Sequence, residues 1–214
     1  MGSGRYYRKI IKKEKNKMNE SRLTVKDLIT SGIFSALIFI CINISGGPLM
    51  MIPTLTFYYS VGCALLAGPV YLLMLAKVPK RGPIYIAGAL LALFCLVTGM
   101  HIGMVISYIV CSVIADLIAA TKKYKSVKRN IISYIIFSFG GVGTYVAFYI
   151  NPAGWLKTMA DKGTSSEYLS TFKAAGTYKT LIIMIIGTIV IGALSGFVGS
   201  KLLRKHFEKA GITA

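Results

Sequence analysis

Long apolar runs alternate with short polar or basic segments along nearly the whole sequence. An apolar run of about 20 residues is long enough to cross a bilayer as an α-helix. Six such runs cover approximately residues 28–44, 55–76, 84–97, 102–120, 131–150 and 180–203. The third is short and is bounded by Pro83 and the TGMHIG turn. The pattern predicts an all-α, polytopic membrane protein in which residues 23–214 form one domain of six transmembrane helices.

The positions of the basic residues predict how these helices are oriented. With the N-terminus inside the cell, 21 of the 25 Lys and Arg fall in the N-terminal tail, the two inner connections and the C-terminal end. The remaining four, Lys157, Lys162, Lys173 and Lys179, share one outer loop. Because short cytoplasmic loops are enriched in Lys and Arg, we predict that both termini are cytoplasmic.

The net charge of +18 is explained by this insertion pattern. Nucleic-acid-binding surfaces interleave basic side chains with aromatic platforms on one face, whereas here the basic residues separate apolar runs. We therefore expect the lipid bilayer, and no nucleic acid, as a partner.

The basic N-terminal tail, residues 1–22, is predicted to be disordered because its composition cannot form an apolar core. Within it, Met18 follows the run KKEKNK, whose codons are rich in A and G, as in a ribosome-binding region. We interpret Met18 as the natural start, with a solvated cytoplasmic tail as the alternative.

Motifs for ATP hydrolysis and for metal chemistry are missing from the sequence. It contains no GxxxxGK[ST] or HExxH motif, its two histidines lie at opposite ends of the predicted bundle, and its four cysteines lie in apolar runs without CxxC spacing. The glycine-rich GGVGTY segment lies inside a predicted helix and not after a strand, so it is no dinucleotide-binding motif. We favour close helix packing or a flexible point there over a substrate-binding role. We expect no catalytic residue, metal or cofactor, and therefore no enzyme.

Asp116 is the one acidic residue inside a predicted span. Intramembrane acids are functional candidates, but Asp116 is near the inner interface, where an ion pair with Lys122 or Lys123 is an equal alternative. Ion-coupled carriers usually place acids or broken helices near the midplane, and this pattern is missing.

Aromatic and polar residues gather at the predicted outer ends of the helices. They form either an interfacial aromatic belt or a ligand site, since such sites are apolar concavities with a few placed polar groups. We place the ligand site between the fourth, fifth and sixth helices, under the 1–2 connection and the long loop after residue 150. The preferred substrate contacts are His101, Tyr108, Asn151 and Trp155, followed by Asn43, Tyr145, Tyr149 and Tyr178.

The first helix carries small residues four positions apart, Gly32 and Ala36, with Ser35 beside them. Residues at this spacing share one helix face, and small residues allow close helix approach in membranes. This face is interpreted as a docking site for a partner subunit, with packing inside the chain as the alternative. The sixth helix repeats the pattern at Gly192, Gly196 and Ser200.

These features resemble the S components of energy-coupling factor (ECF) transporters, specifically those of the Trep_Strep, or MptD-type, family. The resemblance rests on LTVKDLITSGIFSAL, AGPVYLLMLAKVPKRG, TGMHIG, ADLI followed by YKS, and GSKLLRKHFEKAGI. It implies a substrate-binding subunit that captures a vitamin or other small micronutrient, in the cytoplasmic membrane of a prokaryote. An ECF transmembrane coupling protein and two ATPase subunits would be its partners. Gly32 and Ala36 would then dock on the coupling protein, with glycine in place of the first alanine.

Three other functions compete with this one. The chain could be a solo carrier or channel, an integral membrane enzyme using His101, or a structural subunit.

Overall fold

The computed structural model describes residues 22–209, and it defines side chains as far as residue 205. The predicted tail, apart from Arg22, and the predicted C-terminal segment beyond residue 209 lie outside this part of the chain. The described residues form helices and contain no strand. In chain order they are α2 (Val25–Ser45), α3 (Gly47–Met50), the 3₁₀ turn η1 (Thr56–Tyr58), α4 (Tyr59–Lys77), α5 (Pro83–Val97), α6 (Ile102–Ala120), α7 (Val127–Ser138), the 3₁₀ turn η2 (Phe139–Val142), α8 (Gly143–Ile150), α9 (Pro152–Asp161), α10 (Ser166–Ala175) and α11 (Tyr178–Lys209).

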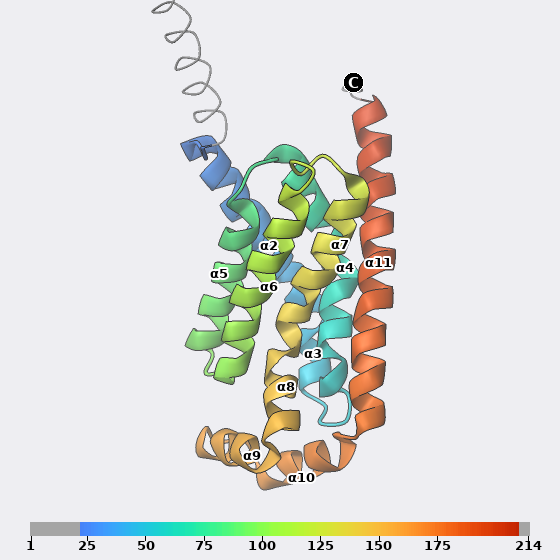
Figure 1. Ribbon diagram of the computed structural model, residues 1–214. Coiled ribbons are helices and arrows are strands. Elements are labelled where there is room, and N and C mark those ends of the chain that lie inside the picture. Colours follow the sequence, from blue (N-terminus) through green and yellow to red (C-terminus); the bar gives the residue numbers. More distant parts are fainter. Residues whose placement is uncertain (1–21, 210–214) are drawn as a thin grey trace, which may run out of the picture.

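The long helices run side by side as one bundle (Figure 1). Five segments are long and apolar enough to cross a membrane, namely Val25–Ser45, Thr56–Lys77, Ile102–Ala120, Val127–Ile150 and Tyr178–Lys205. The predicted third span forms α5, which has 15 residues. At 1.5 Å per residue this helix is about 22 Å long, shorter than a hydrocarbon core of about 30 Å. The structure thus supports an all-helical membrane fold with five candidate spans and one shorter apolar helix.

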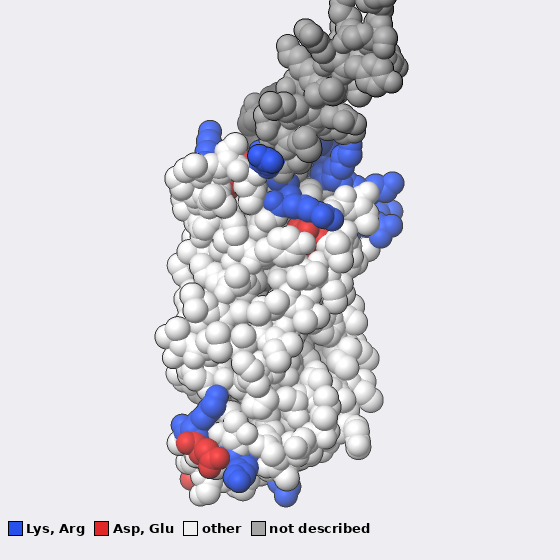
Figure 2. Space-filling model, turned by 60° about the vertical axis from the view of Figure 1, so that its left-hand side comes forward, with Lys and Arg blue, Asp and Glu red and all other residues white. Residues whose placement is uncertain are grey.

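Charged residues divide the bundle into two unlike ends. The start of α2 and the end of α11 lie at the same end (Figure 1), which we call the basic end. Figure 2 shows Lys and Arg gathered there, above a wide band without charged side chains on that face. At the opposite end, which we call the distal end, α9 and α10 lie across the helices (Figure 1).

The start of α2 is fixed at the basic end by a capping box and an ion pair. Thr24 caps the helix, accepting from the Asp27 amide through its side chain, and the Asp27 carboxylate accepts from the Thr24 amide in return. The same carboxylate accepts a 2.8 Å bond from the ammonium of Lys80 in the α4–α5 connection. The first span is therefore tied to the connection between the next two bundle helices.

Small residues bring α11 into backbone contact with α4. The Ser195 hydroxyl donates to the carbonyl of Leu65 at 2.7 Å. A Cβ at Gly199 would lie 2.7 Å from the Cα of Pro69, and one at Gly68 would collide with Ser195. Two other glycines of this helix, Gly192 and Gly196, face α7. Close approach of this kind maximises van der Waals contact, which drives helix association in lipid.

Glycines also explain the irregular fifth span, α7–η2–α8. A Cβ at Gly140 would collide with the ring of Tyr108, and one at Gly143 would collide with the carbonyl of Gly103. The GGVGTY segment therefore serves close packing against α6, the function favoured by its position in an apolar run.

Candidate functional site

The distal end contains a small hollow that we call the distal cavity. Its volume is about 70 Å³. The helical hairpin α9–α10, residues 152–175, lies across this end of the bundle, and we call it the distal lid. The cavity is lined by four methionines, aromatic rings and a few polar groups, namely Met50, Thr56, Met100, His101, Met104, Thr144, Tyr145, Trp155, Met159, Tyr168 and Phe172.

Stacked aromatic rings hold the lid against the bundle. Trp155 of α9 stacks on Phe172 of α10 with ring centroids 4.4 Å apart and planes at 10°. Phe172 also stacks on Phe57 of η1, with ring centroids 4.5 Å apart, and meets Phe148 of α8 edge-on, with ring centroids 4.9 Å apart. Aromatic pairs of these geometries stabilise by about 0.5–1.5 kcal/mol beyond area burial. The cluster thus joins both lid helices to two segments of the bundle.

The polar groups around the cavity are paired with one another. The Trp155 indole donates to the Thr144 hydroxyl at 3.0 Å. The hydroxyls of Thr56 and Tyr145 lie 3.1 Å apart and share one hydrogen bond. A ligand entering here would therefore have to exchange these bonds for its own, which favours ligands carrying a few donors and acceptors at fixed positions.

His101 caps the N-terminus of α6 at the edge of this cavity. Its Nδ1 accepts from the amide of Gly103 at 3.0 Å, which leaves Nε2 as the protonated, donating nitrogen. Burial, and after it the positive charge of Lys162, lower the pKa of His101 from its usual value. The imidazole is therefore neutral at pH 7, and its ring lies 6.3 Å from that of Trp155.

Two hydrogen-bonded ties fix the outer edge of the lid. The Lys162 ammonium, at the end of α9, donates to the carbonyls of Gly99 and Met100 at 2.7 and 3.0 Å. The Tyr168 hydroxyl of α10 donates to the carbonyl of Met50 at 2.7 Å. The lid is therefore attached to the α5–α6 turn on one side and to α3 on the other.

The structure brings together three of the eight predicted substrate contacts. His101, Tyr145 and Trp155 line the distal cavity. Tyr108 is buried deeper, beside a void of about 10 Å³ between α2, α4, α6 and α7. Asn151 is exposed and caps α9, accepting from the Gly154 amide at 2.9 Å.

The other three predicted contacts lie outside the cavity. Asn43 is exposed and donates to the carbonyl of Phe39 in its own helix. Tyr149 is partly buried, and its hydroxyl donates to the carbonyl of Thr177. The side chain of Tyr178 is exposed at the start of α11.

Several cavity-lining residues were not among the predicted contacts, including the four methionines, both threonines, Tyr168 and Phe172. A signal was present for the lid. Trp155 and Met159, and likewise Tyr168 and Phe172, are four residues apart, which places each pair on one face of a helix. This spacing predicts two short amphipathic helices where the sequence interpretation has a loop.

The predicted docking face on α2 divides between surface and interior. A Cβ at Gly32 would meet no atom within 4 Å, and Ala36 is exposed. Ser35 is fully buried and donates to the carbonyl of Ser31 at 2.7 Å. Gly32 and Ala36 therefore form a smooth outward surface, and Ser35 lies on an adjacent, packed side of the helix.

Asp116 is fully buried near the basic end, and its contacts differ from the two lysines considered from the sequence. One carboxylate oxygen accepts from the hydroxyl of Tyr124 at 2.9 Å, and the other lies 3.7 Å from Nε of Arg81. Burial, and a hydrogen bond to this carboxylate, raise the pKa of Tyr124. The arrangement joins α6 to the α4–α5 connection through Arg81 and to the α6–α7 connection through Tyr124.

The described part of the chain holds no group of three His, Cys, Asp or Glu side chains suited to a metal ion.

Its apolar exposed helices and charge-free central band define an integral membrane protein with several helices in the bilayer. The chain belongs to the Trep_Strep family, described as hypothetical bacterial integral membrane proteins, whose family model matches residues 25–209. No curated protein and no solved structure matches the chain.

Proposed function

We propose that this protein is the substrate-binding membrane subunit, or S component, of an ECF-type uptake transporter. In this proposal the basic end faces the cytoplasm and the distal end faces outward. The distal cavity takes up a vitamin or other small micronutrient, and a coupling protein with two ATPase subunits supplies the movement. The proposal does not assign an enzymatic activity to this chain.

The observation that supports it best is the separation of two surfaces along the bundle. A lidded, aromatic-lined cavity lies at the distal end, and an open face of small residues, Gly32 and Ala36, lies near the middle of α2. A subunit that binds substrate on one side and docks on a partner within the membrane needs both surfaces. The contrast with α11 strengthens the assignment, because the small residues of α11 are already in contact with α4 and α7.

The cavity also limits the chemistry of the substrate. None of the residues that line it is Asp, Glu, Lys or Arg. Its walls offer aromatic faces, thioethers, two threonine hydroxyls and a neutral imidazole, which suit an uncharged, flat molecule with few hydrogen-bonding groups. Ligand pockets usually measure about 300–1,000 Å³ and this cavity measures about 70 Å³, so the proposal requires the distal lid to move away from the bundle when substrate enters.

A solo ion-coupled carrier is less well supported. The intramembrane acid Asp116 lies near the basic end, away from the distal cavity, and is engaged by Tyr124 and Arg81. A carboxylate with these partners is better suited to holding α6 in place than to binding a transported ion.

Co-purification tests the proposal directly. The full chain, carrying an affinity tag, would be isolated from its native membrane and its partners identified by mass spectrometry. We expect a transmembrane coupling protein and two ATPases, together with a retained small molecule. Recovery of the chain alone, with transport reconstituted in liposomes without ATPases, would contradict the proposal and favour a solo carrier.

Orientation is tested by labelling single cysteines with a membrane-impermeant reagent in intact cells. The substitutions are Lys125→Cys at the basic end and Lys162→Cys at the distal end, in a background without the four native cysteines. We expect labelling at position 162 only. Labelling at position 125 from outside would reverse the assigned orientation.

A further inference from the structure

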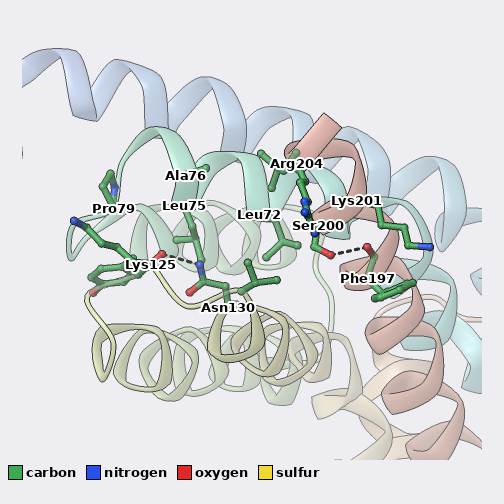
Figure 3. Close-up of a pocket in the computed structure, with 13 residues that line it drawn as sticks. Leu72, Leu75, Ala76, Pro79, Lys125, Asn130, Phe197, Ser200, Lys201 and Arg204 are labelled. Atoms are coloured by element: carbon green, nitrogen blue, oxygen red, sulfur yellow. Dashed lines mark hydrogen bonds between the residues drawn. The ribbon is translucent and has the colours of Figure 1, made fainter. Parts of the chain in front are cut away.

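A second and much larger cavity opens at the basic end, far from the distal lid. Its volume is about 660 Å³, within the usual range for ligand sites. It lies between the end of α4, the start of α7 and the last turns of α11 (Figure 3). No part of the proposed substrate site contributes to it.

The walls of this basic-end cavity are mostly apolar. Leu72, Leu75 and Ala76 of α4 form one side, while Val127 of α7 and Phe197 of α11 contribute others. These apolar side chains line the hollow. An occupant must therefore bring an apolar portion.

The cations at the rim add a second requirement. Lys125 precedes α7, whereas Lys201 and Arg204 lie on α11, and all three line the cavity. Figure 3 shows Lys125 and Arg204 on different sides of the hollow. Among the side chains defined in residues 22–205, neither Lys125 nor Lys201 joins an ion pair. The ammonium of Lys201 lies 4.6 Å from the centroid of the Phe197 ring.

We propose that the basic-end cavity binds an anionic phospholipid, with its phosphate at the basic rim and part of an acyl chain along the apolar walls. The ends of α4 and α7 place the cavity at headgroup level, where basic pockets between membrane helices bind anionic headgroups. Charge complementarity selects the headgroup, and the apolar walls select a lipid over a free phosphate. This assignment is independent of the proposed transport function.

The test compares phosphatidylglycerol with phosphatidylcholine bearing the same dioleoyl chains. Purified full-length protein in a neutral detergent is titrated with each lipid, and bound lipid is counted by native mass spectrometry. We expect one tightly held phosphatidylglycerol and weaker phosphatidylcholine. The double variant Lys125→Gln/Lys201→Gln should weaken phosphatidylglycerol binding at least about tenfold, because each basic residue near a headgroup contributes about fivefold.

Two further variants keep the proposal falsifiable if the double variant folds poorly. Ala76→Trp projects an indole from an exposed wall position into the cavity and should displace the lipid while leaving every cation in place. The control Lys157→Gln/Lys173→Gln removes two exposed lysines from the distal lid and should leave binding unchanged.

Each alternative outcome overturns the assignment. Equal retention of the two lipids would mean that the cations do not select the headgroup. Undiminished phosphatidylglycerol binding in both the lysine and the Ala76 variants would place the lipid elsewhere. Competition by sodium phosphate or glycerol phosphate at concentrations similar to that of the lipid would identify a free-phosphate site, in which the apolar walls have no role.

Discussion

Trp155 and Phe172 lie face to face, with ring planes 10° apart and centroids separated by 4.4 Å, although they belong to different helices of the distal lid. The Phe172 ring also stacks on Phe57 of the bundle, so one side chain joins both lid helices to the membrane domain.

Phe172→Ala is therefore expected to release the lid. Removing a buried Phe typically costs about 3–5 kcal/mol, which corresponds to a fall in Tm of roughly 10 °C for a chain of this size. Thermal unfolding, together with limited proteolysis between α9 and α10, checks this. Phe197→Ala is the matched control, because it removes the same atoms from a half-exposed ring of α11. Equal effects of the two substitutions would contradict the assigned role.

Lys162→Met should loosen only the edge of the lid. The ammonium donates to two backbone carbonyls of the α5–α6 turn, and loss of such bonds should increase local opening by roughly threefold to tenfold. Hydrogen exchange in α9 measures this opening, with Lys157→Met on an exposed position of the same helix as the control. Unchanged exchange in α9 would mean that the aromatic stack alone holds the lid.

Gly32→Leu and Ala36→Leu should leave the isolated subunit folded, because both positions face outward. Under the proposed function they should abolish pull-down of the coupling protein while preserving substrate binding. Gly199→Leu makes the contrasting case, since a side chain there meets the α4 backbone, and it should destabilise the whole fold. If both α2 variants still pulled down the coupling protein normally, this face would not be the docking site.

Acidification should destabilise the distal end through His101. Its folded-state pKa lies below the usual value, so between these two values the unfolded chain binds more protons and stability falls as pH falls. Protonation of Nδ1 would also break its bond with the Gly103 amide. His101→Asn retains a capping acceptor without this titration. Between about pH 7.5 and about pH 5, Tm should fall more steeply in the wild type than in this variant, and parallel curves would refute the prediction.

Tyr124→Phe should destabilise the basic end. Its hydroxyl is a hydrogen-bond donor to the buried Asp116 carboxylate, and leaving a buried polar group unpaired costs about 1–3 kcal/mol. We expect a Tm several degrees lower than that of the wild type, whereas Tyr178→Phe on the exposed start of α11 should have no effect. No difference between the two variants would show that Arg81 alone satisfies Asp116.

The sequence predicted the helices well because apolar length is a property of single segments. Five of the six runs became candidate spans, and the run flagged as short became α5. The lid was missed as helical structure because α9 and α10 are short and of mixed polarity. Their apolar faces become meaningful only when they lie across the bundle.

The site was less predictable because the position of a residue along a helix does not show whether its side chain points into the bundle or out of it. Ser35 and Ala36 are neighbours, yet one is buried and the other exposed. Tyr108 was predicted to face the ligand site. Its ring instead packs against Gly140 in the interior of the bundle, where a larger residue would leave no room for it. Such outcomes depend on which helices become neighbours, a relationship between distant segments that hydropathy does not encode.

The contact between α4 and α11 has a mechanical consequence. Ser195 and Gly199 fit against Gly68 and Pro69 so closely that even a single added Cβ collides. Sliding either helix along the other would drive larger side chains into the same gaps. We therefore expect α4 and α11 to move as one rigid unit. If the protein tilts in the bilayer, this unit moves the basic end and the distal end together.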